Sequence, residues 1–305
     1  MRVADPVPHQ ERQYRSRIGD ADRALIVARI EAAWAEQLSV DHAFAQAWDD
    51  GLMLASRRSW WRVAADIEDQ STRPVAPTRR TSKTPRQAPV LQATGPGQVW
   101  SWDITDLRSP WRGMSFKAYS IIDIYSRKLI GCRVEDREVD DLAVELFTDA
   151  FAAHGTPHYV HADSGSAMRS TVLANLLRDH HITQTHNRPH VSNDNPFSES
   201  EFRTMKYRPN YPGTFTDLDQ ARAFVAWYVP WYNQNHKHSG IALFSPDEVH
   251  DGTWRELWHK RDQTLQDYYA AHPERFRRSP TTPAPADLVG INLPQDDNTE
   301  RLHAA

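Results

Sequence analysis

Apolar residues follow helical and strand-like spacings in different parts of this 305-residue chain. Between residues 21 and 68 they recur at three- and four-residue intervals, which is typical of amphipathic helices. The first helix has an apolar side that includes Leu25 and Ile30. Ser39 is a capping residue for the second helix, and a third begins after Ser56. This part of the chain is therefore predicted to form three short helices.

Strand and helix patterns alternate from residue 97 to residue 190. Strands are predicted at 99–106, 116–125, 128–134, 159–162 and 182–186, and helices at 139–153 and 166–180. The second and third strands form a hairpin about Ser126-Arg127. This order predicts an α/β fold with a mixed sheet. A further helix at 217–235 has aromatic residues at helical spacing and is predicted to pack against that sheet.

Changes in composition divide the chain into five segments. They are an N-terminal arm at 1–20, a helix-turn-helix-like module at 21–72, a basic Pro-rich linker at 73–96, an α/β core at 97–250 and a C-terminal helix with a Pro-rich tail at 251–305.

The overall composition is that of a soluble globular protein, with 39% hydrophobic and 25% charged residues. No apolar run is long enough to span a membrane and the N-terminus has no apolar stretch of a signal peptide, so we expect a cytoplasmic protein. Cys132 is the single cysteine, which excludes an internal disulfide and a cysteine-based zinc finger within this chain. The 15 histidines are scattered and do not have the spacing of a zinc site.

Three acidic residues lie in three separate local contexts. Asp103 is in a strand-like run, Asp163 ends another strand, and Glu199 is in the first turn of a helix that Asn195 and Pro196 open. Carboxylates placed in this way can converge, and such oxygen-rich sites suit two divalent cations in phosphoryl transfer. The chain has 40 acidic residues, so a triple chosen without further context is weak evidence.

The sequence around each acid is more specific. The stretches WSWDIT, HADSGSAM and NRPHVSNDNPFSESEFRTMKYRP contain the three acids, and IIDIYSRKLIG, WYNQNHKHSGIALFSPDEVH and AAHPERF follow the same order. Together they resemble the DDE transposases, which share a catalytic core with retroviral integrases. More narrowly, they are similar to the catalytic product of bacterial insertion sequences that divide their transposase over two reading frames. The resemblance covers roughly residues 20–290.

The resemblance implies a ribonuclease-H-like core at 97–250 and metal-dependent cleavage and strand transfer of mobile-element DNA. Asp103, Asp163 and Glu199 would be the catalytic residues and would hold two Mg²⁺ ions, with Mn²⁺ as a substitute. Lys206, seven residues after Glu199, would contact the DNA end.

Nearby polar residues offer alternatives to these assignments. Glu201 competes with Glu199, but it lies about 200° around the helix from it. Asp106 is predicted to lie on the surface, and Asp123 to make structural hydrogen bonds. Arg203 is on the Glu199 side of the helix and is predicted to bind phosphate with Lys206; the alternative is a surface ion pair of Arg203 with Glu199.

Basic residues outside the core are further candidates for DNA binding, although the net charge is −4. Arg57, Arg58 and Arg62 lie beside Trp60 and Trp61 in the third helix, which would enter a major groove in a helix-turn-helix module. The alternative is a three-helix bundle whose tryptophans form the core. In the linker the candidates are Arg79, Arg80 and Lys83, and the alternative there is a solvated spacer.

The expected partners are the element ends and target DNA, further copies of this chain on DNA, and a helix-turn-helix protein from an upstream reading frame. The expected place of action is the nucleoid in a bacterial cytoplasm. Two other functions stay open from the sequence: a nuclease of the same fold that only hydrolyses DNA, and a DNA-binding regulator that uses residues 21–68.

Overall fold

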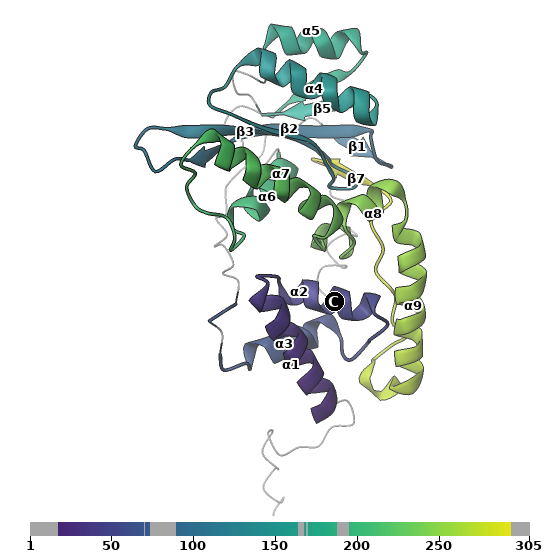
Figure 1. Cartoon of the computed structure of the whole chain (residues 1–305). Helices are drawn as coiled ribbons and strands as arrows, with labels where there is room; N and C mark the ends of the chain where they lie inside the picture. Colours follow the sequence, from purple (N-terminus) through teal and green to yellow (C-terminus); the bar gives the residue numbers. More distant parts are fainter. Residues whose placement is uncertain are drawn as a thin grey trace, which may run out of the picture. The chain divides into compact units, whose positions relative to one another are not determined.

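The computed structural model describes residues 18–69, 71–73, 90–163, 168, 170–187 and 195–293. The chain divides into two compact units, and each unit combines two separate stretches of sequence. One unit comprises Met1–Pro74 and Trp254–Ala284, and the other comprises Val75–Thr253 and Pro285–Ala305. Within the described residues, the first unit is helical and the second contains the strands (Figure 1).

The first unit confirms the three helices predicted near the N-terminus. They are α1 (Asp20–Ala35), α2 (Val40–Asp49) and α3 (Arg57–Ala65). The Ser39 and Ser56 side chains accept hydrogen bonds from backbone N–H groups in the first turns of α2 and α3. The prediction for Leu25 was wrong, because this side chain is 51% exposed while Ile26 is buried. The buried side of α1 is therefore rotated relative to the predicted one.

A C-terminal helix completes the first unit. Helix α9 (Trp254–Ala271) packs against α2, and a short 3-10 turn, η4 (Pro273–Arg275), follows it. The Trp48 ring nitrogen donates a hydrogen bond to the Arg261 carbonyl oxygen over 2.8 Å. The Arg261 side chain, which is 1% exposed, is paired with Asp49 at 2.8 Å. This unit therefore includes part of the segment predicted as a separate C-terminal region.

The second unit contains a five-stranded sheet. Its strands are β2 (Val99–Arg108), β3 (Ser115–Asp123), β4 (Leu129–Glu135), β5 (Tyr159–Ala162) and β6 (Thr183–His186). The spatial order is β4-β3-β2-β5-β6. The β2-β3 and β3-β4 pairs are antiparallel, whereas β2-β5 and β5-β6 are parallel. The predicted mixed sheet is confirmed.

Helices cover both faces of this sheet (Figure 1). Helices α4 (Asp140–His154) and α5 (Thr171–Asp179) form one apolar cluster with Trp100 and Trp102 of β2. Helices α6 (Pro196–Lys206) and α7 (Leu218–Gln234) form a second cluster that includes Leu107. Because side chains alternate along a strand, the odd-numbered residues of β2 point to the α6 face. The aromatic helix α7 packs against the sheet as predicted.

The turn between β3 and β4 is stabilised by a buried carboxylate. Asp123 is fully buried and accepts hydrogen bonds from the Gly97 N–H at 2.7 Å and from the Ser126 N–H and hydroxyl, each at 2.8 Å. Arg127 adopts a positive φ of 67° in this turn. The predicted hairpin and the predicted structural role of Asp123 are both confirmed.

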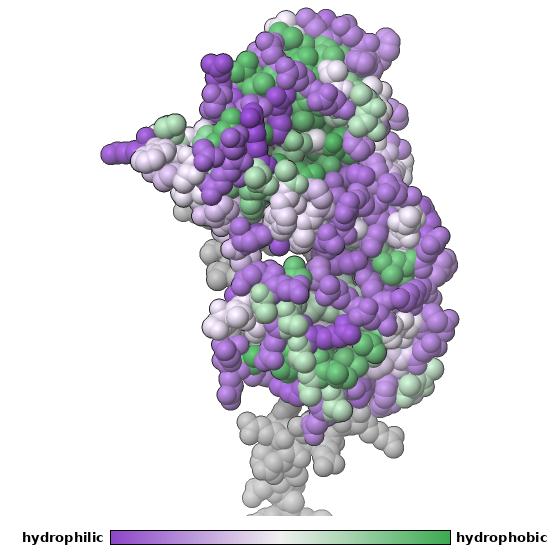
Figure 2. All heavy atoms as spheres, in the orientation of Figure 1, coloured by the Kyte–Doolittle hydropathy of each residue, from purple (hydrophilic) through white to green (hydrophobic). Residues whose placement is uncertain are grey.

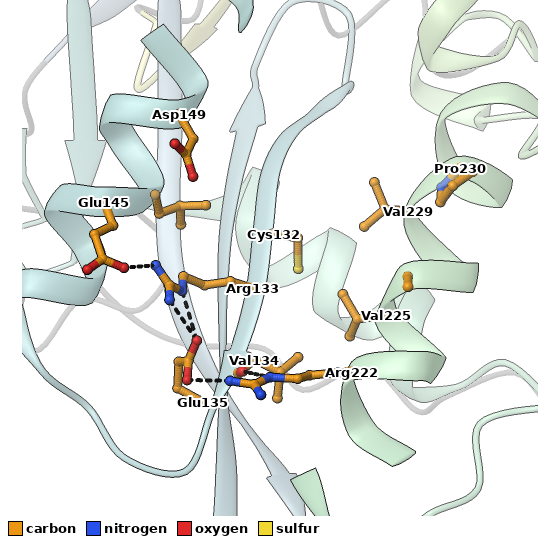
Figure 3. Close-up of a pocket in the computed structure, with 12 residues that line it drawn as sticks. Cys132, Arg133, Val134, Glu135, Glu145, Asp149, Arg222, Val225, Val229 and Pro230 are labelled. Atoms are coloured by element: carbon orange, nitrogen blue, oxygen red, sulfur yellow. Dashed lines mark hydrogen bonds and ion pairs between the residues drawn. The ribbon is translucent and has the colours of Figure 1, made fainter. Parts of the chain in front are cut away.

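The edge strand β4 is tied to helices on both sides by ion pairs (Figure 3). Arg133 pairs with Glu135 of its own strand and with Glu145 of α4, each at 2.8 Å. Arg222 of α7 pairs with Glu135 at 2.7 Å. These side chains line a pocket together with Cys132 and apolar residues of α7, and none of the three candidate acids lines it.

A small second sheet joins distant parts of the sequence in this unit. Strand β1 (Leu91–Ala93) pairs antiparallel with β7 (Val289–Ile291). Residues predicted as the end of the linker and as part of the C-terminal tail are therefore paired here. After β6 and α7 the chain forms a 3-10 turn, η3 (Ser239–Ile241), and α8 (Pro246–Asp251). None of the helices within the described ranges combines the length and the apolar character that crossing a membrane requires.

Candidate active site

Strand β2 directs Asp103 toward helix α6. Ser101, Asp103 and Thr105 alternate with the tryptophans of the opposite face, so they share the α6 side of the sheet. The Asp103 carboxylate accepts a hydrogen bond from the Ile104 backbone N–H at 2.8 Å. Its neighbour across the β2-β3 ladder is Ser120.

Asp163 lies beside Asp103 because their strands are neighbours. Strand β5 runs parallel to β2, with Ala162 in register with Trp102, so each acid follows a paired residue at the same end of the sheet. The His186 ring Nδ1 donates a hydrogen bond to the Asp163 carbonyl oxygen at 2.9 Å. The fully buried His161 bonds Thr185 and Asn187, which fixes β5 against β6.

The charges of Asp163 and Glu199 act on the Asp103 carboxyl. The pKa of Asp103 is raised to about 7, mainly by burial and in part by the charges of Asp163 and Glu199. The Ile104 N–H and the Lys206 ammonium act in the opposite direction. The fold thus brings the three sequence-predicted acids close enough for electrostatic coupling, although they come from β2, the end of β5 and α6.

Glu199 and Glu201 have opposite environments on α6. Glu199 as a whole residue is exposed to solvent. Its carboxyl group is nevertheless partly shielded from water, and this loss of hydration raises its pKa. Glu201 is 1% exposed and accepts a hydrogen bond from the Ser120 hydroxyl at 3.3 Å. Burial raises the Glu201 pKa to about 8, with smaller effects from neighbours that include Asp103 and Lys206. Glu201 is therefore a buried and largely neutral acid at pH 7.

A buried polar cluster joins α6 to β2 next to these acids. The Ser101 hydroxyl donates to the Asn195 side-chain oxygen and lies 3.0 Å from the Ser198 hydroxyl. The Asn195 amide also donates to the Trp102 carbonyl oxygen at 3.4 Å. All three side chains of this cluster are at most 1% exposed. Asn195 is the N-cap residue of α6, as predicted, but its side chain makes no capping hydrogen bond.

The sequence reasoning missed this cluster. The signal available was Ser101, a polar residue two positions before Asp103 and therefore on the same strand face. Its partners lie more than 90 residues away, and local spacing does not predict such contacts.

Lys206 points from the end of α6 to the same face of β2. Its ammonium donates a hydrogen bond to the Thr105 hydroxyl. Burial lowers its pKa, and Asp106, Arg108, Glu201 and Asp103 all lie near enough to affect it. Arg203 is exposed on the same helix. Asp106 is exposed and paired with Lys117, which confirms its predicted surface position.

The basic residues of α3 have different surroundings in the helical unit. Arg57 makes two hydrogen bonds to the Asp41 carboxylate, at 2.6 and 2.7 Å. Arg62 donates to the Ser59 hydroxyl at 2.8 Å, and Arg58 is exposed. Trp60 is fully buried, whereas Trp61 is 39% exposed. Trp60 therefore belongs to the core, as the alternative prediction stated for both tryptophans. Trp61 and Arg58 lie on the surface of α3 instead. The linker candidates Arg79, Arg80 and Lys83 lie outside the described residues.

The donor atoms of the acids suit a hard divalent cation. Asp103, Asp163 and Glu199 supply carboxylate oxygens, the donors that magnesium and manganese prefer. Over the described ranges, no three His, Cys, Asp or Glu side chains are grouped tightly enough to form a complete metal site. The acids therefore match such a cation in donor type.

Comparisons with known proteins match the α/β unit. Two models, both described as integrase core domain, match residues 93–192 and 180–246, which together make up half of the chain. The transposase of insertion sequence element IS904 from Lactococcus lactis is 29% identical over 162 residues, covering 52% of this chain and 63% of that protein. The transposase InsF of insertion sequence IS3A from Escherichia coli is 30% identical over 159 residues, covering 51% of this chain and 54% of that protein.

The chain therefore spans a little over half the length of these relatives. Among solved structures, the catalytic core domain of HTLV-2 integrase in complex with magnesium is 16% identical to this chain. That likeness has a TM-score of 0.40 and covers 51% of this chain and 97% of the integrase chain.

Proposed function

Because the chain belongs to the family of proteins with an integrase core domain, we propose that it is a transposase that cleaves and joins the DNA of a mobile element. The observation that supports this most is geometric: the neighbouring parallel strands β2 and β5 place Asp103 and Asp163 at the same end of a mixed sheet, and α6, which carries Glu199, packs against β2. The similarity to transposases of insertion sequences supports it independently.

Asp103, Asp163 and Glu199 would be the catalytic residues and would hold two Mg²⁺ ions, with Mn²⁺ as a substitute. When bound, the ions would supply activation of the attacking hydroxyl and stabilisation of the leaving oxygen. The chain itself would position the DNA and needs no nucleophilic side chain. In joining, the 3′-hydroxyl of the element loses its proton to water and forms the new P–O bond. The old P–O bond of the target breaks, and the released 3′-oxygen takes up a proton from water, so no net proton is gained or lost.

Basic residues would position the DNA around this site. Lys206 lies beside Asp103 and would contact the phosphate backbone of the DNA end, with Arg203 on the same helix. We also propose contacts from Arg58 and Arg62 of α3, and from Arg79, Arg80 and Lys83. Arg57 would have to give up its pairing with Asp41 to join them.

The partners in this proposal are the element ends, target DNA and further copies of the chain. Joining two ends requires two sites near each other, which favours an oligomer on DNA. A helix-turn-helix protein from an upstream reading frame would add recognition of the ends. Because DNA is the substrate, we propose that the protein acts at the nucleoid, in a bacterial cytoplasm.

The proposal is tested by a strand-transfer assay with the full chain, DNA carrying candidate element ends, and a plasmid target. We expect joined products with Mg²⁺, none with a chelator, and none from Asp103→Asn. The matched control is Asp106→Asn, which changes an exposed acid of the same strand that is paired with Lys117.

Other outcomes would identify the competing functions. Mg²⁺-dependent hydrolysis without joined product would indicate a nuclease of the same fold. DNA binding without any cleavage would indicate a regulator.

A further inference from the structure

An exposed aromatic surface lies where α6 ends and meets α7. Trp227 and Trp231 of α7 stack with ring centroids 6.1 Å apart and planes 13° from parallel. The Arg208 guanidinium carbon lies 3.2 Å from the Trp231 ring centroid and 5.3 Å from that of Trp227. Trp227 is 43% exposed and the neighbouring Tyr207 is 59% exposed. In Figure 2 the region over α7 carries residues of mixed hydropathy.

Core packing explains only one side of α7. Val225, Tyr228 and Tyr232 are buried in the cluster that α7 forms with the sheet. Trp227 lies on another side of the helix, and a large part of its ring surface contacts solvent. Large exposed aromatic side chains next to a cation are typical of binding surfaces.

The charge of this surface suits an anionic partner. Burial lowers the pKa of Arg208 to about 10, so the side chain is still protonated at pH 7. Its side chain donates a hydrogen bond to the Asn210 side-chain oxygen at 3.0 Å. Among the described residues, no carboxylate contributes to the shift of its pKa. Arg108 adds a second exposed cation near Lys206 and Tyr211.

Helix α6 connects this surface to the candidate acids. Glu199 is in its first turn and Tyr207 is its C-terminal capping residue. The eight residue steps between them correspond to roughly 12 Å along a helix. A DNA strand whose bases keep duplex-like stacking advances roughly 3.4 Å per nucleotide, so this distance corresponds to about three to four nucleotides of a flank that stays stacked.

We propose that Tyr207, Arg208 and Trp227 form a surface on which an unpaired base of the substrate DNA stacks, about three to four nucleotides from the phosphate held at the acids. The position along the strand rests on the proposed function. The aromatic rings would bind the face of the base, and Arg208 would attract the adjacent phosphate. Stacking of this kind depends little on which base is present. The surface would therefore hold a frayed strand without reading its sequence.

The first test is photo-crosslinking of the full chain. DNA would carry 5-iodo-deoxyuridine at one position at a time, from one to eight nucleotides from the joining phosphate in an unpaired flank. We expect adducts on Trp227 or Tyr207, with the highest yield at the third or fourth nucleotide. Adducts spread evenly over the positions, or adducts confined to other residues, would overturn the inference.

The second test is binding affinity. We expect Trp227→Ala to weaken binding of DNA with an unpaired flank by about 10-fold, the effect typical of losing one stacked base. Binding of fully paired DNA should change by less than about 2-fold, because its bases have no free faces. Trp227→Phe should retain most of the affinity. The matched control is Trp111→Ala, which removes a tryptophan that is 62% exposed elsewhere in the same unit.

Three results would contradict the inference. They are an equal loss on flanked and fully paired DNA, an equal loss from Trp111→Ala, or a change of oligomeric state in Trp227→Ala with unchanged DNA affinity. The last would indicate that a second copy of the chain covers this surface. Failure of the proposed function would give a different result from failure of this inference. In that case the wild-type protein would bind the unpaired flank through Trp227 but would not join DNA.

Discussion

The Ser101 hydroxyl donates a hydrogen bond to the Asn195 side-chain oxygen, and this contact joins the strand of Asp103 to the helix of Glu199. Ser198 lies against the same hydroxyl. Asp103 and Glu199 therefore lie within a few residues of this buried contact. The contact between Ser101 and Asn195 fixes β2 and α6 relative to each other near the two acids.

We expect Asn195→Ala to reduce joining by roughly 10-fold or more, because small displacements of catalytic groups have effects up to about 100-fold. The loss of a buried hydrogen bond should also lower the free energy of unfolding by about 1–3 kcal/mol. The measurements are joining rate against Mg²⁺ concentration and thermal unfolding of the same preparations.

Asn233→Ala is the matched control for Asn195→Ala. The Asn233 side chain is buried and bonds the Leu129 backbone at 2.8 and 3.0 Å, in the same unit and away from the candidate acids. It should destabilise the protein by a similar amount and leave the Mg²⁺ dependence of joining unchanged. If both variants lose activity in proportion to stability, the contact has only a structural role.

Substitution of Glu199 and Glu201 separates the two candidates for the third acid. Glu199→Gln should abolish joining, as should Asp103→Asn and Asp163→Asn, because each would remove a charged metal ligand. Glu201→Gln should retain activity, since this buried side chain is already largely neutral at pH 7. The readout is the yield of joined DNA, with circular dichroism to verify folding. An inactive Glu201→Gln with an active Glu199→Gln would reverse the assignment.

Glu201 should also make stability dependent on pH. Its pKa is about 8 in the folded protein and 4.5 is its ordinary value, so between these values the folded state binds a proton that the unfolded state has lost. The free energy of unfolding should therefore fall as pH rises from about 5 to 8, by up to about 1.4 kcal/mol per pH unit from this group. Denaturant titrations of the wild type and Glu201→Gln should show a smaller fall in the variant. Equal slopes would mean that Glu201 is not buried as a neutral acid.

Lys206→Ala should weaken binding of DNA ends and reduce the slope of log affinity against log salt by about one phosphate contact. The reason is that its ammonium lies beside Asp103 while it bonds the uncharged Thr105 hydroxyl. The metal preference of joining should not change. Lys117→Ala is a control, because Lys117 is already paired with Asp106. An unchanged salt slope with unchanged joining would assign Lys206 to the surface alone.

Much of the core was predictable from local patterns in the sequence. The alternation from 99 to 106 predicted β2, and the 3.6-residue period distinguished the side of Glu199 from that of Glu201. Such features depend on backbone geometry within a few residues. For that reason the five strands of the main sheet and the β3-β4 hairpin agree with the sequence-based prediction, whereas α5 (Thr171–Asp179) begins later than the helix predicted at 166–180.

Other features were decided only by tertiary structure. The side chain of Asn195 could cap its helix or bond a strand, and the position of Ser101 across the α6 interface selects the strand. Leu91 pairs with Ile291 although they lie at opposite ends of the described α/β unit. The sheet and α7 bury Glu201, and this burial raises the pKa of its carboxyl to about 8. The sequence by itself determined the local helices and strands and which side of each is buried. Contacts between distant residues depend on how these elements pack, and local periodicity does not contain that information.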